Sequence, residues 1–87
     1  MEPVPVQVLS LFSADGAPQP IRFRFEDPEH CLHTVRVTKV VDVREVTFVG
    51  LEAFRFLCLS EEENTAHLFE LDYTVRTHRW RLRRRVY

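Results

Sequence analysis

The stretch AHLFELDYTVRTHRWRLRRRVY, residues 66–87, gives the clearest indication of the fold. Apolar and polar residues alternate on both sides of its central TVRT segment, and a period of two is typical of a β-strand that is buried on one face. We therefore expect two antiparallel strands, a β-hairpin that anchors a small all-β domain. The residues expected to face the interior are His67, Phe69, Leu71, Tyr73, Trp80, Leu82 and Val86.

The two arms of this hairpin can be aligned by the side on which their residues lie. If Tyr73 is opposite His78, residues 74–77 form a four-residue loop, which is a common hairpin connection. The inward pairs are then Leu71 with Trp80 and Phe69 with Leu82, and the outward pairs are Asp72 with Arg79 and Glu70 with Arg81. A slip of one residue would turn one arm inside out, so the sequence favours this register over its immediate neighbours.

Four further extended segments precede this hairpin, at residues 4–12, 21–26, 32–48 and 52–59. The third is too long for one flat strand, and its valines change phase: Val41 and Val43 share one phase, whereas Val40 and Val46 are in the other. Such a change indicates a β-bulge or a sharp bend that lets one strand take part in both halves of a curled sheet. No segment has a helical period long enough to predict a helix, and residues 49–57 come nearest to one.

Six extended segments separated by turn signals predict an all-β fold. We expect a small antiparallel barrel or a strongly curled sheet of five to six strands, SH3-like or OB-like in size. A chain of 87 residues is expected to form a single domain, residues 1–87.

Composition sets further limits on the class of protein. Hydrophobic residues make up 45% of the chain and there are only two glycines, which excludes a disordered or low-complexity protein. No apolar run approaches the roughly 20 residues of a membrane helix and no secretion signal is recognisable, so we expect a cytoplasmic protein. The two cysteines do not form a disulfide framework, and the net charge of −1 argues against a surface that is basic throughout.

The outward side of the predicted sheet contains an apolar group. With Ser60 opposite Thr65, the inward pairs are Phe56 with Phe69, Phe54 with Leu71 and Cys58 with His67. The outward residues then form three rows across the strands. The first row is Arg55, Glu70 and Arg81, the second is Leu57, Leu68 and Arg83, and the third is Leu59 and Ala66. The exposed face of an antiparallel sheet is normally polar, so Leu57, Leu59 and Leu68 should be covered by the first strand or by another copy of the chain. The preferred function is therefore a non-enzymatic β-module that acts through a protein-interaction surface and self-associates.

The candidates for chemistry are two sets of cysteine and histidine residues. His30, Cys31 and His33 lie close together, but zinc sites normally contain paired C-x-x-C or H-x-x-x-H spacings, which the chain lacks. Cys58 and His67 could form a thiolate–base pair, but both are expected to face a packed core without a third group. We therefore expect no metal, no cofactor and no enzymatic activity.

The last feature that points to a function is the abundance of arginine. It accounts for eleven of the twelve basic residues, and six of these arginines lie in the last hairpin. Guanidinium groups bind phosphate through paired hydrogen bonds. Arg79 and Arg81 have carboxylate partners in the predicted register, and Trp80 faces inward, where it cannot stack on a base. The alternative function is a nucleic-acid-binding accessory protein, and the residues that would carry it are Arg76, Arg83, Arg84 and Arg85.

Several strand motifs also occur together in a fixed order. They are Pro20-x-x-Phe23-x-Phe25, Ala53-Phe54-Arg55-Phe56, Leu68-Phe69-Glu70-Leu71 and Arg79-Trp80-x-Leu82-x-Arg84-x-Val86-Tyr87, with a valine-rich strand between the first two. Over residues 20–87 this order resembles a small bacterial all-β family of unknown function, although residues 46–48 replace a tryptophan-containing segment of that family. The resemblance implies an all-β fold and, because such proteins occur near DNA-repair polymerases, a link to nucleic acid. It assigns no functional residues.

Overall fold

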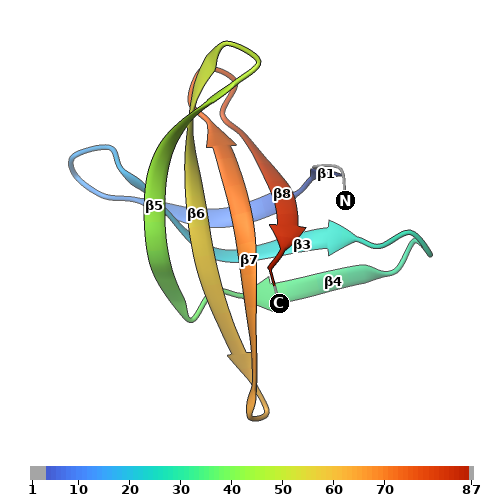
Figure 1. Ribbon diagram of the computed structural model, residues 1–87. Helices are drawn as coiled ribbons and strands as arrows, with labels where there is room; N and C mark the ends of the chain where they lie inside the picture. Colours follow the sequence, from blue (N-terminus) through green and yellow to red (C-terminus); the bar gives the residue numbers. More distant parts are fainter. Residues whose placement is uncertain (1–3, 87) are drawn as a thin grey trace.

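The computed structural model describes residues 4–86 apart from the Phe48 side chain, so Tyr87 at the end of the predicted hairpin lies outside it. Its strands are β1 (Val4–Pro5), β2 (Gln7–Phe12), β3 (Pro18–Glu26), β4 (Leu32–Arg36), β5 (Lys39–Phe48), β6 (Leu51–Glu62), β7 (Thr65–Thr74) and β8 (Arg79–Arg85). Five of them form an antiparallel sheet in the order β1-β8-β7-β6-β5, and three form a second sheet in the order β2-β3-β4 (Figure 1).

Residues 4–86 contain no helix, and hence none that is long and apolar enough to cross a membrane. Residues 49–57, which came nearest to a helical pattern, form a turn and the first part of β6, in agreement with the strand predicted at residues 52–59.

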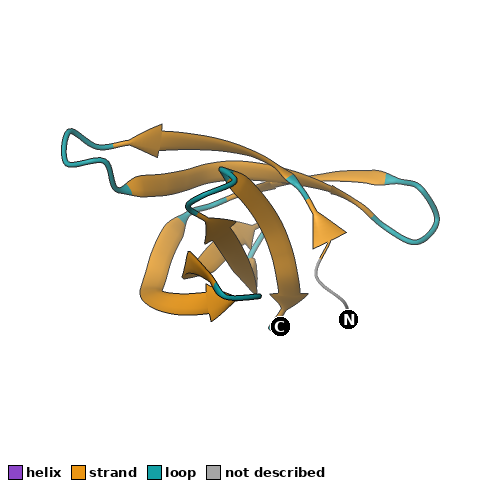
Figure 2. Cartoon of the chain, turned by 90° about the horizontal axis from the view of Figure 1, so that it is seen from above, coloured by secondary structure: helices purple, strands orange, loops and turns teal. Residues whose placement is uncertain are grey.

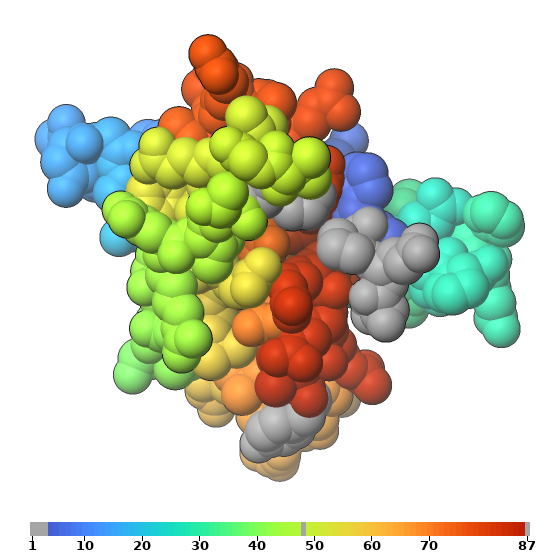
Figure 3. Space-filling model, turned by 45° about the horizontal axis from the view of Figure 1, so that its top comes forward, coloured from blue at the N-terminus to red at the C-terminus, as the bar shows by residue number. Residues whose placement is uncertain are grey.

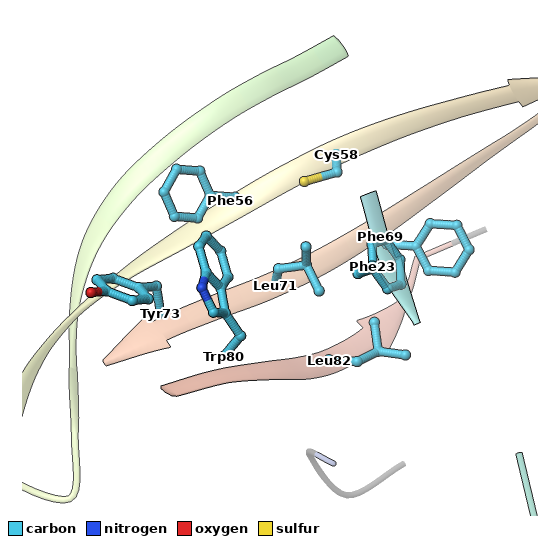
Figure 4. Close-up of a cluster of buried hydrophobic side chains, with 8 residues drawn as sticks. All are labelled: Phe23, Phe56, Cys58, Phe69, Leu71, Tyr73, Trp80 and Leu82. Carbon is cyan, nitrogen blue, oxygen red and sulfur yellow. The ribbon is translucent and has the colours of Figure 1, made fainter. Parts of the chain in front are cut away.

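The core lies between the two sheets, whose strands cross steeply (Figures 1 and 2). Figure 4 shows its buried side chains, which are Phe23, Phe56, Cys58, Phe69, Leu71, Tyr73, Trp80 and Leu82. The ring centroid of Trp80 lies 4.8 Å from that of Tyr73 and 5.5 Å from that of Phe56. The prediction that the hairpin of residues 66–87 buries its alternate residues is confirmed for five of the seven: Phe69, Leu71, Tyr73, Trp80 and Leu82.

A corner in the chain at Val37 and Thr38 joins the two sheets. The Val37 amide donates to the Ile21 carbonyl of the three-stranded sheet at 2.8 Å, and the Thr38 amide donates to the Leu59 carbonyl of the five-stranded sheet at 2.7 Å. A β-bulge follows early in β5. The long strand expected at residues 32–48 is therefore divided into β4 and β5, which confirms the predicted bend.

The two sheets do not close into a barrel within residues 4–86. Strands β1 and β5 are the edges of the larger sheet, and β2 and β4 are the edges of the smaller one. The all-β prediction is confirmed, but its barrel form finds no support in this strand order. The described residues, 4–86, form eight strands rather than five to six, because the first and third predicted strands each divide where the chain passes between the sheets.

The register of β7 with β8 differs from the prediction by two residues. The observed pairs are Phe69 with Arg85, Glu70 with Arg84, Leu71 with Leu82, Asp72 with Arg81 and Tyr73 with Trp80, so the four predicted pairs are wrong. The loop has four residues as expected, but it spans residues 75–78. His78 adopts a φ of 56°, and its Nδ1 lies 2.8 Å from the Tyr73 hydroxyl oxygen. A loop moved by one residue changes the register by two, so inward residues up to Leu82 keep their predicted face.

The register of β6 with β7 is also two residues from the prediction. Glu63 and Asn64 form a two-residue turn with φ values of 46° and 65°. Positive φ at both positions is the type I′ geometry that matches the twist of a hairpin. The inward pairs are Phe54 with Tyr73, Phe56 with Leu71, Cys58 with Phe69 and Ser60 with His67, which corrects the pairing of Cys58 with His67.

Candidate functional site

Leu57, Leu59 and Leu68, the leucine patch, lie together on the outer face of the five-stranded sheet. Leu59 is directly opposite Leu68, and Leu57 is two residues before Leu59 on the same face. The predicted pairs of Leu57 with Leu68 and Leu59 with Ala66 are therefore wrong by the same two-residue shift. Each leucine is half-buried. Figure 3 shows this face of the molecule, where atoms of β5 and β8 flank those of β6 and β7.

The first strand does not cover the leucine patch, contrary to one of the two expectations. Strand β1 pairs with the edge of β8, and β2 pairs with β3 in the other sheet. Val86 was expected to face the interior, but it is 41% exposed, and its amide donates to the Leu68 carbonyl at 2.6 Å. The leucine patch thus has an exposed apolar neighbour and, within residues 4–86, no covering strand.

A buried carboxylate lies between two arginines on the same face. Asp72 is opposite Arg55 of β6 and Arg81 of β8, and it is only 3% exposed. Arg55 donates two hydrogen bonds to it, from Nε to Oδ1 at 2.8 Å and from Nη2 to Oδ2 at 3.0 Å. These bonds raise the pKa of Arg55. The sequence analysis placed Glu70 in this row, and the two-residue shift of register puts Asp72 there instead.

Glu70 binds two other arginines with the help of a bulge in β8. Leu71 is opposite Leu82 but Glu70 is opposite Arg84, so Arg83 is the extra residue of the bulge. The Glu70 Oε1 accepts hydrogen bonds from Arg83 Nη1 at 2.8 Å and from Arg84 Nε at 2.6 Å. Burial pushes the pKa of Glu70 upward, but the bonds and charges of Arg84 and Arg83 outweigh it, and the pKa is lowered overall. The bulge also reverses the phase of the strand, which is why Val86 faces outward.

The structure separates the four arginines of the expected nucleic-acid site. Arg83 and Arg84 are held by Glu70, which the sequence analysis assigned to Arg81. Arg76 lies in the exposed loop before β8, and Arg85 is exposed at the end of β8. Neither of these two forms an ion pair with another residue of the range 4–86.

The histidines of the β3–β4 hairpin contact nearby acids. His30 Nδ1 lies 2.8 Å from Glu26 Oε1, and His33 Nε2 lies 2.7 Å from Asp27 Oδ2. The hydrogen bond from His33 is the main reason that the pKa of Asp27 is lowered. Cys31 is exposed beside them. Among the described residues, no three His, Cys, Asp or Glu side chains gather as metal ligands would.

Cys58 belongs to the core. It is 1% exposed, and burial raises the pKa of its thiol to about 12. Its neighbour across the strands is Phe69, whereas His67 is opposite Ser60. A buried, protonated thiol without an adjacent base is a poor nucleophile, so this cysteine fills space between the sheets.

A groove of about 750 Å³ opens between the sheets beside the edge strand β5. Its apolar wall consists of Pro20, Ile21, Val37, Val40, Val43, Phe54 and Phe56, and its charged residues are Asp15 and Lys39. The sequence analysis missed it, because its walls come from segments far apart in the chain. The only signal was that Val40 and Val43 differ in phase, which marks the bend between the sheets.

Comparisons of the chain with protein families, curated proteins and solved structures find no match.

Proposed function

We propose that the protein is a non-enzymatic interaction module that self-associates through the leucine patch. The observation that supports this proposal is the cluster of Leu57, Leu59 and Leu68 on a sheet face that no strand of residues 4–86 covers. Apolar area removed from water contributes roughly 25 cal/mol per Å². A second copy packed on this face would therefore gain from burying the leucines and the neighbouring Val86.

Charged residues border the leucine patch on both sides. Leu57 lies opposite Glu70 on β7 and opposite Asp42 on β5, and Glu70 is held by Arg83 and Arg84. An apolar centre with a polar rim is the usual anatomy of a protein interface. Since a stable interface buries about 1,200–2,000 Å² in total, the partner copy must extend over this rim as well as over the leucines.

The alternative of a nucleic-acid accessory protein that uses the C-terminal arginines has weaker support. Glu70 already binds Arg83 and Arg84, which leaves Arg76 and Arg85 of the expected set without an ion pair among residues 4–86.

The test is light scattering over a concentration series with the wild type and two variants. Leu68→Glu places a charge in the leucine patch, whereas Leu32→Glu changes an exposed leucine of the other sheet. We expect a dimer for the wild type and for Leu32→Glu, and a monomer for Leu68→Glu with an unchanged circular dichroism spectrum. A wild type that stays monomeric at every concentration, or a Leu68→Glu protein that dimerises normally, would show the proposal to be wrong.

A further inference from the structure

Arg22 and Arg24 of β3 and Arg36 of β4, the arginine face, lie on the outer side of the three-stranded sheet. All three are exposed, whereas Phe23 and Val35, which alternate with them, pack toward the core. The two sheets form separate layers (Figure 2), so the arginine face and the leucine patch are on opposite sides of the molecule.

The strand register brings like charges together on this face. Arg22 is directly opposite Arg36, and Arg24 is two residues from Arg22 on the same side of β3. Like charges directly opposite one another destabilise a sheet. None of the three forms an ion pair with another residue of the range 4–86. The arrangement lowers the stability of the free protein, and a bound anion would remove that cost.

Two adjacent hollows lie between these guanidinium groups. One, of about 230 Å³, contains Arg22 and Arg24 together with Gln7 and Thr34, and no acidic residue lines it. The other, of about 260 Å³, contains Arg22, Arg36 and Thr34, and the acidic end of β6 forms its remaining wall. Arg22 and Thr34 line both hollows, so the two are side by side.

We propose that the arginine face binds the phosphate backbone of single-stranded nucleic acid. One phosphate lies between Arg22 and Arg24, and a neighbouring one lies between Arg22 and Arg36. Guanidinium groups bind phosphate oxygens through paired, charge-assisted hydrogen bonds. A backbone phosphodiester has two charged non-bridging oxygens on a tetrahedral phosphorus, and these can accept from the Gln7 amide and the Thr34 hydroxyl as well as from the guanidiniums.

The size and borders of the face favour a single strand over a duplex. Neighbouring strands are about 4.8 Å apart and alternate residues of one strand about 6.7 Å apart, so the arginines form one compact cluster that fits a single backbone. Glu61 and Glu62 close one end of it and repel a second backbone. Phe23 and Phe25, the aromatic residues of β3, are turned toward the core, so binding should show little base preference.

The experiment is fluorescence anisotropy with a labelled single-stranded oligonucleotide of mixed sequence over a salt series. Two neutralised phosphates on a single strand predict a slope of log affinity against log salt near −1.4, so a fourfold rise in salt weakens binding about 7-fold. Arg22→Gln, Arg24→Gln and Arg36→Gln should each make the slope shallower by about 0.7. The matched controls, Arg76→Gln and Arg85→Gln, remove exposed arginines outside this face and should leave it unchanged.

Two further measurements sharpen the test. The double variant Glu61→Gln/Glu62→Gln should bind more tightly, because it removes negative charge from the second hollow. Polyglutamate should bind less tightly than the oligonucleotide, and an equimolar duplex should compete poorly.

The proposal is overturned if the wild type does not bind the oligonucleotide at low salt, or if polyglutamate or the duplex binds as tightly. It is also overturned if binding follows Arg76 and Arg85 instead of the arginine face. Dimerisation of the wild type and its loss in Leu68→Glu do not depend on these outcomes, because the two surfaces are on different sheets.

Discussion

The outer faces of the two sheets use arginine in opposite ways. On the five-stranded sheet, Asp72 lies between Arg55 and Arg81, and a second acid is held by two further arginines. On the three-stranded sheet, Arg22 faces Arg36 and no acid pairs with either within residues 4–86. A chain with a net charge of −1 can therefore present one face whose arginines stabilise the fold and another whose arginines are available to a ligand.

The difference shows that the number of arginines in a segment is a poor guide to their role. The C-terminal hairpin has the highest density of arginine in the chain, yet Arg83 and Arg84 bind an acid of their own sheet. The residue across the strand decides whether a guanidinium is neutralised, and only the register reveals that residue.

The largest effect is expected from Asp72→Ala. This change leaves Arg55, whose side chain is 27% exposed, without its carboxylate, and breaking a buried ion pair costs about 3–5 kcal/mol of unfolding free energy. Urea unfolding measures it. The control is Asp42→Ala, which removes the exposed pair with Arg44 and should cost less than about 1 kcal/mol. Equal losses in the two variants would contradict the view that the paired face stabilises the fold.

Glu70→Gln should have an intermediate effect, about 1.5–3 kcal/mol, which is the range for hydrogen bonds to a charged group. The pKa of Glu70 in the folded protein lies below its ordinary value of 4.5. Its ionised form therefore stabilises the fold above that pH, and the contribution is lost as the pH falls through the folded-state pKa. As the pH falls from neutral to below 4.5, the free energy of unfolding should fall less steeply in Glu70→Gln than in the wild type. Parallel curves would exclude this role.

The smallest effect should have the opposite sign. Arg36→Gln removes a like charge opposite Arg22 and should stabilise the protein by about 0.2–1 kcal/mol. Its counterpart Arg81→Gln removes a charge opposite Asp72 and should destabilise it. Differential scanning calorimetry of both variants is the measurement, with a higher Tm expected for Arg36→Gln and a lower Tm for Arg81→Gln. Shifts of Tm in the same direction would show that the arginines of the two faces do not differ in their effect on stability.

The sequence was sufficient to predict which side of the C-terminal hairpin faces the core as far as Leu82, but not the bulge beyond it or the pairing between strands. Because apolar and polar residues alternate with a period of two, the pattern excludes a register shifted by one residue but is equally compatible with one shifted by two. The turns decide between the remaining registers. Asn64 and His78 are residue types enriched in the left-handed conformation, but Glu63, the first residue of its turn, is not. The bulge at Arg83 was hidden for a related reason, because a run of arginines has no apolar phase to interrupt.

The candidate surfaces were predictable to different degrees. The leucine patch follows from alternation alone, since Leu57, Leu59 and Leu68 break the polar pattern of an outer face. The arginine face does not, because Arg22 and Arg24 look like the ordinary outward residues of a strand. Their significance depends on Arg36, which the fold brings opposite them through pairing of β3 with β4.

The corner at Val37 and Thr38 should make the two sheets, and the faces that they carry, unfold together. Its consecutive amides are hydrogen-bonded to different sheets, so neither layer can detach without disrupting the other's anchorage. Both amides should then exchange with deuterium only when the whole molecule opens. A ligand that occupies one layer would slow exchange in the other by the same factor, because binding to the native state raises the stability of the entire cooperative unit.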